Sequence, residues 1–107
     1  MLVSIITVVK NNKNHIARTL ESIVQQKYRN LELIVIDGLS EDGTDIIVKK
    51  YFKKFKLVRR KDKSVYDSIN YACRIANGNY LGLLHSGDVY FDANVINNFV
   101  KNSKNFD

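Results

Sequence analysis

Short apolar runs alternate with amphipathic segments along the whole of this chain, and this alternation restricts its fold more than any other feature. The runs at 3–9, 31–36 and 80–84 are too short to be anything but buried strands, and a shorter strand is predicted at 56–60. Strands that are apolar throughout and alternate with helices form mostly parallel sheets. We therefore predict an α/β fold in which a mostly parallel sheet carries helices on both faces.

The segments between and after these runs carry apolar residues at the spacing of one helical face. Thr44 is expected to cap the second of the four predicted helices, and Asn77-Gly78 is expected to end the third with a left-handed cap. The last helix is predicted at about 92–102. The side chains expected to face inward, helix by helix, are Ile16, Leu20, Ile23 and Val24; Ile47, Val48, Tyr51 and Phe55; Val65, Ile69, Ala72, Cys73 and Ala76; and Val95, Ile96, Phe99 and Val100.

Length and composition fit a single intracellular domain. At 107 residues and 45% hydrophobic content, the chain can form one core but is near the lower limit for an enzyme that holds two substrates. No apolar stretch approaches the about 20 residues of a membrane helix, and no signal-peptide pattern precedes the first strand. The single cysteine, Cys73, favours a reducing compartment and is interpreted as a packing residue, not as a nucleophile. These features predict a cytoplasmic protein.

The formal charge of +6 comes largely from a basic segment at 49–61. Such a cluster can attract nucleic acid or an anionic membrane surface, but a solvated helix face is the commoner origin of this pattern. The aromatic residues Tyr51, Phe52 and Phe55 are better placed in the core than on a platform for bases, and no nucleic-acid fold signature accompanies them. We expect no nucleic-acid partner, and we retain peripheral association with the inner face of the membrane through this segment as a hypothesis.

Two acids follow strands directly. Asp37 ends the second run, and Asp88 lies in the polar turn after the last one. Because ligands of open α/β sheets bind beyond the carboxyl ends of the strands, these positions indicate one polar site. Asp37 suits a ribose hydroxyl or a base N–H, or else it caps its own turn. Asp88 suits a divalent cation that bridges phosphates, or else it is a turn acid.

A third polar group precedes and opens the third predicted helix. Asp67 and Asn70 lie one turn apart on its polar face, and Lys63 comes just before it. These side chains can reach phosphate or sugar hydroxyls, although surface hydrogen bonding is the commoner fate of such residues.

Five ordered motifs together resemble family 2 glycosyltransferases over essentially the whole chain. The resemblance rests on their order and spacing, which are more specific than any single motif. The motifs are Ser4-Ile5-Ile6-Thr7-Val8-Val9-Lys10-Asn11-Asn12, Thr19-Leu20-Glu21-Ser22-Ile23-Val24-Gln25-Gln26, the segment from Leu33 to Thr44, the segment from Asp62 to Asn70, and Asn77-Gly78-Asn79-Tyr80-Leu81 through Ser86-Gly87-Asp88-Val89-Tyr90.

The resemblance implies a Rossmann-like GT-A fold whose N-terminal half binds a nucleotide-diphosphate sugar and a divalent metal, Mn²⁺ or Mg²⁺. It implies an inverting transfer from a donor, with a UDP-sugar favoured, to a glycan or lipid-linked acceptor in cell-surface polysaccharide biosynthesis. By the same resemblance Asp88 is the last acid of an Asp-X-Asp type metal motif, and Asp37 binds the base or ribose. The other donor-binding residues that it implies are Thr7, Val8 and Val9 at the end of the first strand, Lys63, Asp67 and Asn70 near the diphosphate or sugar, and Gly87 beside the metal ligand.

The chain departs from the family pattern at several positions. Gly38 and Gly87 stand where many relatives have a second acid, so that the ribose and the metal have fewer protein ligands. Ser64 replaces a usual glycine. His85 stands where a small amide residue is common, and it either approaches the donor sugar or is structural.

The larger departure is length. Residues 1–107 are predicted to be a single domain, the donor-binding half, with the acceptor-binding half and the general base absent, so the catalytic base is unknown. This fragment is expected to bind donor but to transfer sugar poorly or not at all. Apolar surface exposed where the missing half would dock predicts self-association. A non-catalytic nucleotide-binding α/β domain is the alternative function, and a basic nucleic-acid-binding module is a further rival.

Overall fold

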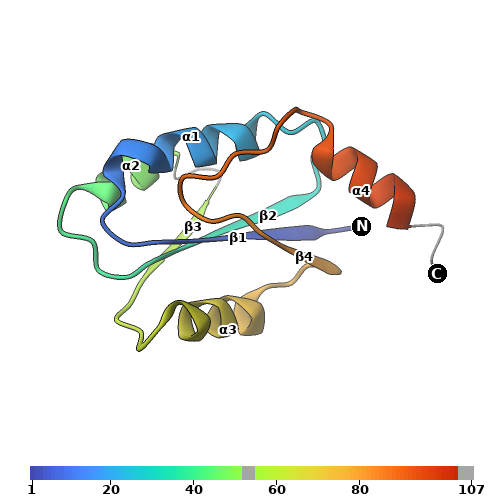
Figure 1. Cartoon of the computed structure of the whole chain (residues 1–107). Helices are drawn as coiled ribbons and strands as arrows, with labels where there is room; N and C mark the ends of the chain where they lie inside the picture. Colours follow the sequence, from blue (N-terminus) through green and yellow to red (C-terminus); the bar gives the residue numbers. More distant parts are fainter. Residues whose placement is uncertain (52–54, 104–107) are drawn as a thin grey trace.

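Within residues 1–51 and 55–103, which the computed structural model describes, four parallel strands form one sheet in the order β3-β2-β1-β4 (Figure 1). The predicted fold class, an α/β arrangement around a parallel sheet, is confirmed. The elements in chain order are β1 (Val3–Val9), α1 (Lys13–Val24), β2 (Leu31–Asp37), α2 (Thr44–Lys50), β3 (Lys56–Arg59), α3 (Val65–Ile75), β4 (Tyr80–Leu83) and α4 (Val95–Ser103).

The register of the sheet aligns the ends of β1, β2 and β3, while β4 ends beside the middle of β1. Val9, the last residue of β1, pairs with Asp37, the last residue of β2, and Asp37 pairs in turn with Arg59 at the end of β3. On the other side of β1, Ile6 pairs with Leu83 at the end of β4. Because all four strands are parallel, the loops that follow them leave the sheet at one edge, which we call the carboxyl edge.

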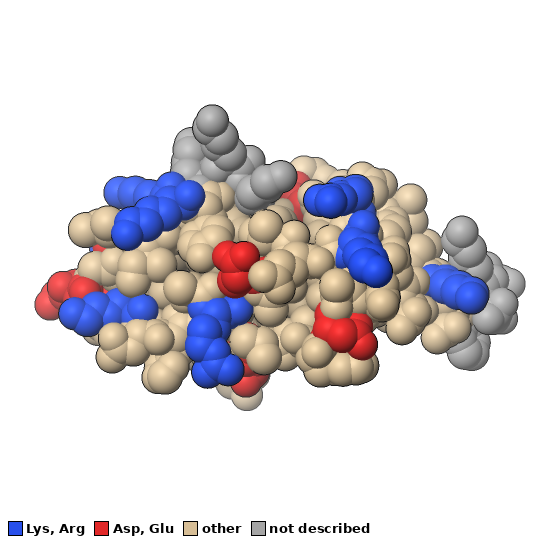
Figure 2. All heavy atoms as spheres, turned by 90° about the horizontal axis from the view of Figure 1, so that it is seen from above, with Lys and Arg blue, Asp and Glu red and all other residues tan. Residues whose placement is uncertain are grey.

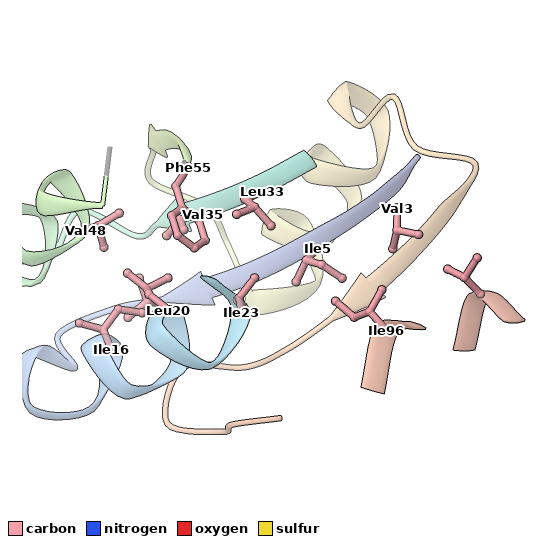
Figure 3. Close-up of a cluster of buried hydrophobic side chains, with 12 residues drawn as sticks. Val3, Ile5, Ile16, Leu20, Ile23, Leu33, Val35, Val48, Phe55 and Ile96 are labelled. Carbon is pink, nitrogen blue, oxygen red and sulfur yellow. The ribbon is translucent and has the colours of Figure 1, made fainter. Parts of the chain in front are cut away.

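Helices cover both faces of the sheet, as predicted. α1, α2 and α4 lie on one face and α3 lies on the other (Figure 1). On the first face, aliphatic side chains of α1 point onto β1 and β2 (Figure 3), and Ile16, Leu20 and Ile23 are at most 1% exposed. Burial of each such side chain contributes about 1.5–3 kcal/mol. This packing makes α1 a fixed support for the loops around it.

α3 contacts the sheet through a face that agrees only in part with the prediction: Ala72 and Ala76 pack against the core, as expected. Its buried residues are Ser68 and Ala72, whereas Val65 is 50% exposed and Cys73 is exposed. The prediction that Val65 and Cys73 face the core is therefore wrong. Small side chains at Ser68 and Ala72 let the helix backbone approach the sheet closely, and the Ser68 hydroxyl is satisfied by Asp62 at 2.7 Å.

Two predicted helix caps also differ in the structure. Gly43, at φ 97°, occupies the N-cap position of α2, and Thr44 is the first helical residue. α3 ends at an extended Ala76, and Gly78 is not left-handed. A Cβ on Gly78 would lie 2.7 Å from the backbone nitrogen of Ser4, so glycine is required there by close approach to β1.

Element ends differ from the predictions by small amounts. β2 continues through Asp37, while β3 and β4 each end one residue earlier than predicted, at Arg59 and Leu83. α4 begins at Val95, because the residues before it form turns. Phe55 is buried but follows α2 instead of belonging to it, and Phe52 lies outside the described residues.

No helix among the described residues is long and apolar enough to cross a membrane.

Candidate functional site

The carboxyl edge contains the point at which the strand order reverses. β2 and β3 extend the sheet on one side of β1, and β4 extends it on the other. In open α/β sheets, ligands bind at this switch point, beyond the carboxyl ends of the strands. The loops after β1 and β4 are therefore expected to form a ligand site.

The loop after β1 is held by the loop after β2. Three consecutive backbone N–H groups, those of Asn11, Asn12 and Lys13, donate to side-chain oxygens of the neighbouring loop. The acceptors are, in order, Ser40 Oγ at 2.8 Å, Thr44 Oγ1 at 3.0 Å and Asp42 Oδ2 at 3.1 Å. The left-handed backbone of Asn11, at φ 50°, is one that asparagine adopts more readily than most residues. These hydrogen bonds fix the backbone conformation that leads into α1.

Asp42 organises the second of these loops. Its carboxylate also accepts hydrogen bonds from the backbone N–H of Thr44 at 3.0 Å and from the Thr44 hydroxyl at 2.5 Å. The hydrogen bond from the Thr44 side chain, joined by those from the Lys13 and Thr44 backbones, holds the pKa of Asp42 below its ordinary value. Asp42 thus anchors the starts of α1 and α2 in its ionised form.

Asp37 lies at the end of β2, fully buried, and protein donors surround its carboxylate. Arg59 Nε donates to it at 2.8 Å, and both the backbone N–H and the hydroxyl of Ser40 donate to it as well. Arg59 also donates to the Ser40 carbonyl at 2.8 Å. The hydrogen bond to Asp37 raises the pKa of the Arg59 guanidinium above its ordinary value. Asp37 therefore orders the loop after β2, as the turn-capping alternative expected.

Asp88 contrasts with Asp37. It is exposed, and among the residues that the structure describes its carboxylate has no hydrogen bond or ion pair. Its backbone N–H donates to the His85 carbonyl at 3.0 Å, which closes the turn. Gly87 has φ 99°, a conformation that other residues rarely adopt. His85 is exposed, so its side chain is not buried in the core.

The loop that carries Asp88 lies beside the loop after β1. The side-chain amide of Asn12 donates to Ser86 Oγ at 2.9 Å, across the switch point between β1 and β4. The Gly87 N–H donates to Thr19 Oγ1 of α1 at 2.8 Å. The structure therefore brings the turn that contains the predicted Gly87 and Asp88 against the N-terminal half of α1.

The side chains of Thr7 and Val9 are 1% and 3% exposed, respectively, and Val8 is partly buried. A ligand at the end of β1 cannot reach Thr7 or Val9 through their side chains, because their positions in the strand turn them into the core. The Thr7 hydroxyl has no hydrogen-bond partner within the described part of the chain. The accessible residues at this strand end are Lys10 and Asn11.

The group before and within α3 is partly used for local structure. Ser64 caps the helix by accepting from the Asp67 N–H at 3.3 Å, and Asp67 accepts in return from the Lys63 N–H at 3.0 Å. This reciprocal pattern is the surface role that the sequence left open for Asp67. The side chains of Lys63 and Asn70 are exposed.

The basic segment does not form an uninterrupted positive surface. Arg59 pairs with Asp37, Arg60 pairs with Asp62 at 2.6 Å, and Lys49 lies 3.8 Å from Asp45. Figure 2 shows the Lys and Arg side chains of one face in separate groups, with acidic side chains between them. The positive charge of the basic segment 49–61 is therefore partly neutralised by ion pairs within the fold.

The side chains around Asp88 suit a metal ion that is coordinated mainly by a bound phosphate compound and only in part by the protein. Within residues 1–51 and 55–103, no group of three or more His, Cys, Asp or Glu residues is placed to hold a metal ion. One protein carboxylate is nevertheless sufficient to bind a metal ion where phosphate oxygens and water complete the coordination. Mg²⁺ is commonly bound in this way. The exposed, unpaired carboxylate of Asp88 fits this mode of binding.

Four residues at this edge, Asn12, Thr19, Ser40 and Arg59, were given no role by the sequence. Arg59 pairs with Asp37 across two strands whose register no local pattern reveals. Thr19 and Asn12 lie within motifs quoted above, but their partners are about 70 positions away in the chain. The sequence signal that could have pointed to these four residues was their polarity at positions next to an apolar strand or helix face.

The sheet order and the helices on both faces define a doubly wound α/β protein with a polar carboxyl edge. The family model for glycosyl transferase family 2 matches residues 4–105, and the chain belongs to this family. The family resemblance drawn from the five motifs is confirmed.

A curated relative supports this assignment. The chain is 34% identical over 110 residues to WfaP of Escherichia coli, a UDP-Glc:alpha-D-GlcNAc-diphosphoundecaprenol beta-1,3-glucosyltransferase. The match covers 98% of this chain and 43% of WfaP, so the chain spans less than half the length of that relative.

Two solved structures share the fold. One is the mannosyltransferase PcManGT from Pyrobaculum calidifontis in complex with GDP-Man and Mn²⁺, with a TM-score of 0.86 and 25% identity over 92% of this chain and 31% of that one. The other is S. aureus TarS 1-349 in complex with UDP-GlcNAc, with a TM-score of 0.90 and 24% identity over 98% of this chain and 32% of that one. The expected GT-A fold is confirmed by these neighbours.

Proposed function

We propose that this chain is the donor-binding part of an inverting glycosyltransferase that acts in cell-surface polysaccharide biosynthesis. The donor is a nucleotide-diphosphate sugar, with a UDP-sugar favoured, and the acceptor is a glycan or a lipid-linked sugar. The observation that carries the proposal is the unpaired carboxylate of Asp88 at the switch point of a family 2 domain. The choice of a UDP-sugar is supported by WfaP, whose name gives UDP-Glc as its donor, and by TarS, which was solved in complex with UDP-GlcNAc.

Asp88 is the proposed anchor of a divalent metal. A bound Mn²⁺ or Mg²⁺ supplies positive charge that offsets the charge developing on the leaving nucleoside diphosphate. The complex of PcManGT with GDP-Man and Mn²⁺ supports a metal of this kind. With only one protein carboxylate available, metal affinity is expected to be weak until a nucleotide supplies phosphate oxygens.

The remaining residues would position the donor. Asp37, held by Arg59 and Ser40, keeps the loop after β2 in place beside the end of β1, where the nucleoside would lie. Lys63 and Asn70, exposed near the start of α3, are the proposed contacts to the diphosphate or the donor sugar.

Transfer itself would require groups beyond these 107 residues. An inverting reaction requires a general base within hydrogen-bond reach of the acceptor hydroxyl. We propose that residues 1–107 form one donor-binding domain, and that the acceptor site and the base belong to a further part of the enzyme. The chain's coverage of 43% of WfaP supports this division.

Location and assembly are further parts of the proposal. A cytoplasmic protein at the inner membrane face would use the exposed basic side chains of Lys50, Lys56 and Lys61 to contact anionic lipid. Self-association would use the outer side of β4, where Leu81 and Leu83 are 48% and 45% exposed. Sedimentation with anionic vesicles and sizing over a range of concentrations test these two points separately.

Calorimetric titration tests the proposed donor class. The chain would be titrated with UDP, UDP-sugars, GDP and GDP-mannose in Mn²⁺, and again in EDTA. The expected result is binding that requires Mn²⁺ and that is tighter for one sugar nucleotide than for its plain nucleotide. Equal binding of plain and sugar nucleotides would favour the alternative, a non-catalytic nucleotide-binding domain. Absence of binding to every nucleotide in Mn²⁺ would contradict the proposal.

A further inference from the structure

One face of α1 and its flanks presents a row of polar side chains to the segment that follows β4. We call this row, Asn12, Thr19, Ser22 and Gln26, the polar stripe; its spacings of seven, three and four residues keep it on one side of a helix. Every member bonds to the segment 86–96. The bonds are Asn12 Nδ2 to Ser86 Oγ at 2.9 Å, Gly87 N to Thr19 Oγ1 at 2.8 Å, Tyr90 N to Ser22 Oγ at 3.2 Å, Gln26 Nε2 to the Asp92 carbonyl at 2.7 Å, and Ile96 N to Gln26 Oε1 at 3.1 Å.

Two members of the stripe are buried beside apolar residues, and Asn12 and Ser22 are partly buried. Thr19 is 0% exposed and Gln26 is 3% exposed, beside the core residues Leu20 and Ile23. Polar side chains in such a place are unfavourable unless their hydrogen bonds are made, and here the bonds are made to the 86–96 segment. The stripe therefore specifies one position of that segment against α1.

The segment requires outside partners, because it has no ladder or helix of its own. After Leu84, whose N–H donates to the Ile6 carbonyl at 3.0 Å, the described part of the chain, up to residue 103, forms no further strand and enters α4 only at Val95. Its backbone N–H and C=O groups must then be satisfied by other elements or by water. The polar stripe satisfies the N–H groups of Gly87, Tyr90 and Ile96 and the carbonyl of Asp92.

Asp88 lies next to the first two attachment points. Ser86 and Gly87 are both bonded to α1 or its N-terminal flank, and the left-handed Gly87 sets the direction of the chain into Asp88. The Asp88 carboxylate has no hydrogen-bond or ion-pair partner within the described residues, so its place is set through its backbone. A site that relies on one protein carboxylate is sensitive to small errors in the position of that carboxylate.

We infer that the polar stripe of α1 positions the Asp88 loop for binding of the metal and diphosphate, with Thr19 as its central positioning residue. Thr19 does not touch the ligand; it acts through the Gly87 N–H. The inference rests on the proposed function of Asp88, and it extends that function to the residues on α1. Groups that orient metal ligands typically alter metal affinity by about 10–100-fold when they are removed.

The experiment compares Thr19→Val with Thr19→Ser in the full chain. Valine keeps the shape of threonine and removes the acceptor for the Gly87 N–H, whereas serine keeps the hydroxyl. Ser4→Ala is the matched control, because Ser4 is also 0% exposed and its hydroxyl is also bonded, to Glu32 and Gly78, at the opposite edge of the sheet. Two quantities are measured: affinity for UDP and for GDP in Mn²⁺, and backbone amide exchange in the ligand-free chain.

Thr19→Val is expected to weaken Mn²⁺-dependent nucleotide binding by about tenfold or more and to speed amide exchange at Gly87 and Asp88. Thr19→Ser is expected to restore both quantities, and Ser4→Ala to change neither, even if it lowers the melting temperature. Thr19→Val with the parent's affinity and the parent's exchange at Gly87 would overturn the inference.

Failure of the proposed function has a different signature. In that case the parent chain binds neither nucleotide in Mn²⁺, and the exchange data decide on their own whether α1 holds the loop. Faster exchange at Gly87 and Asp88 in Thr19→Val then supports the positioning role of the stripe, and unchanged exchange rejects it.

Discussion

Two aspartates at the carboxyl edge lie in contrasting environments. Asp37 is fully buried, and its carboxylate accepts hydrogen bonds from Arg59 and Ser40. Asp88 is exposed and has no such partner within the described residues. The sequence placed both at strand ends and could not distinguish them, because the partners of Asp37 become neighbours only when β2 pairs with β3.

This contrast predicts that the same substitution, Asp to Asn, changes the free energy of unfolding at one position and hardly at the other. Asp37→Asn should lower the free energy of unfolding by about 1–3 kcal/mol, since hydrogen bonds to a buried charged group are lost or weakened. Asp88→Asn should change it by no more than about 0.5 kcal/mol, as expected at an exposed site without partners. Urea unfolding followed by circular dichroism measures both. A large loss of stability in Asp88→Asn would mean that its carboxylate has a structural partner.

At the scale of elements, local pattern predicted the strands and helices better than it predicted how they pack. The apolar run at 3–9 became β1 with the predicted bounds, because a short continuous apolar run bounded by polar residues permits little else. The side of α3 that faces the sheet was wrong at Val65 and Cys73, because Ser68 gains its burial from a hydrogen bond to Asp62. Hydrophobic periodicity contains no information about that bond.

The junction before β4 gives a second prediction at this scale. Gly78→Ala should destabilise the fold by about 1–3 kcal/mol, because the new Cβ would lie 2.7 Å from the Ser4 nitrogen and 2.9 Å from the Tyr80 carbonyl oxygen. Gly38→Ala is the control, since the nearest atoms to a Cβ there belong to the Lys10 side chain, at 3.5 Å or more, which is ordinary van der Waals contact. Thermal unfolding of the two variants measures the difference. Equal melting temperatures would contradict the close approach of this junction to β1.

The same junction predicts a dependence on pH. Burial raises the pKa of Glu32, but hydrogen bonds from the Asn77 backbone, the Ser4 hydroxyl and the Asn77 side chain, with the charge of Lys56, bring it below its ordinary value of 4.5. A carboxyl with a lowered pKa in the fold stabilises above its unfolded pKa, and that contribution is lost as pH falls through the folded pKa.

Glu32→Gln should therefore be less stable than the parent at neutral pH, and the difference should shrink once the pH falls below 4.5. Denaturant unfolding at a series of pH values measures this difference. A gap between the two proteins that is constant from neutral to acidic pH would show that the Glu32 charge does not stabilise the junction.

At the scale of the whole molecule, parallel strands gather residues from distant parts of the sequence at one edge. The fold class followed from the alternation of strands and helices, and acids at strand ends indicated the edge at which the candidate site lies. The contacts that fix the site could not be predicted in this way, because they join α1 to a segment about 70 residues later. Burial of Thr7 and Val9 agrees with the buried strand predicted at 3–9, and it leaves only their backbone groups for the ligand contact that the family resemblance implies.

The most direct test of this account is to locate bound Mn²⁺ by paramagnetic broadening of backbone amide signals in the presence of UDP or GDP. The account predicts strong broadening at His85, Asp88 and Asn11 and little at Asn30 and Asn79, which lie at the opposite edge of the sheet. Asp88→Asn should abolish the broadening. Glu41→Gln, which removes one negative charge from the same edge, should retain it. Broadening centred away from the Asp88 loop, or unchanged in Asp88→Asn, would contradict the account.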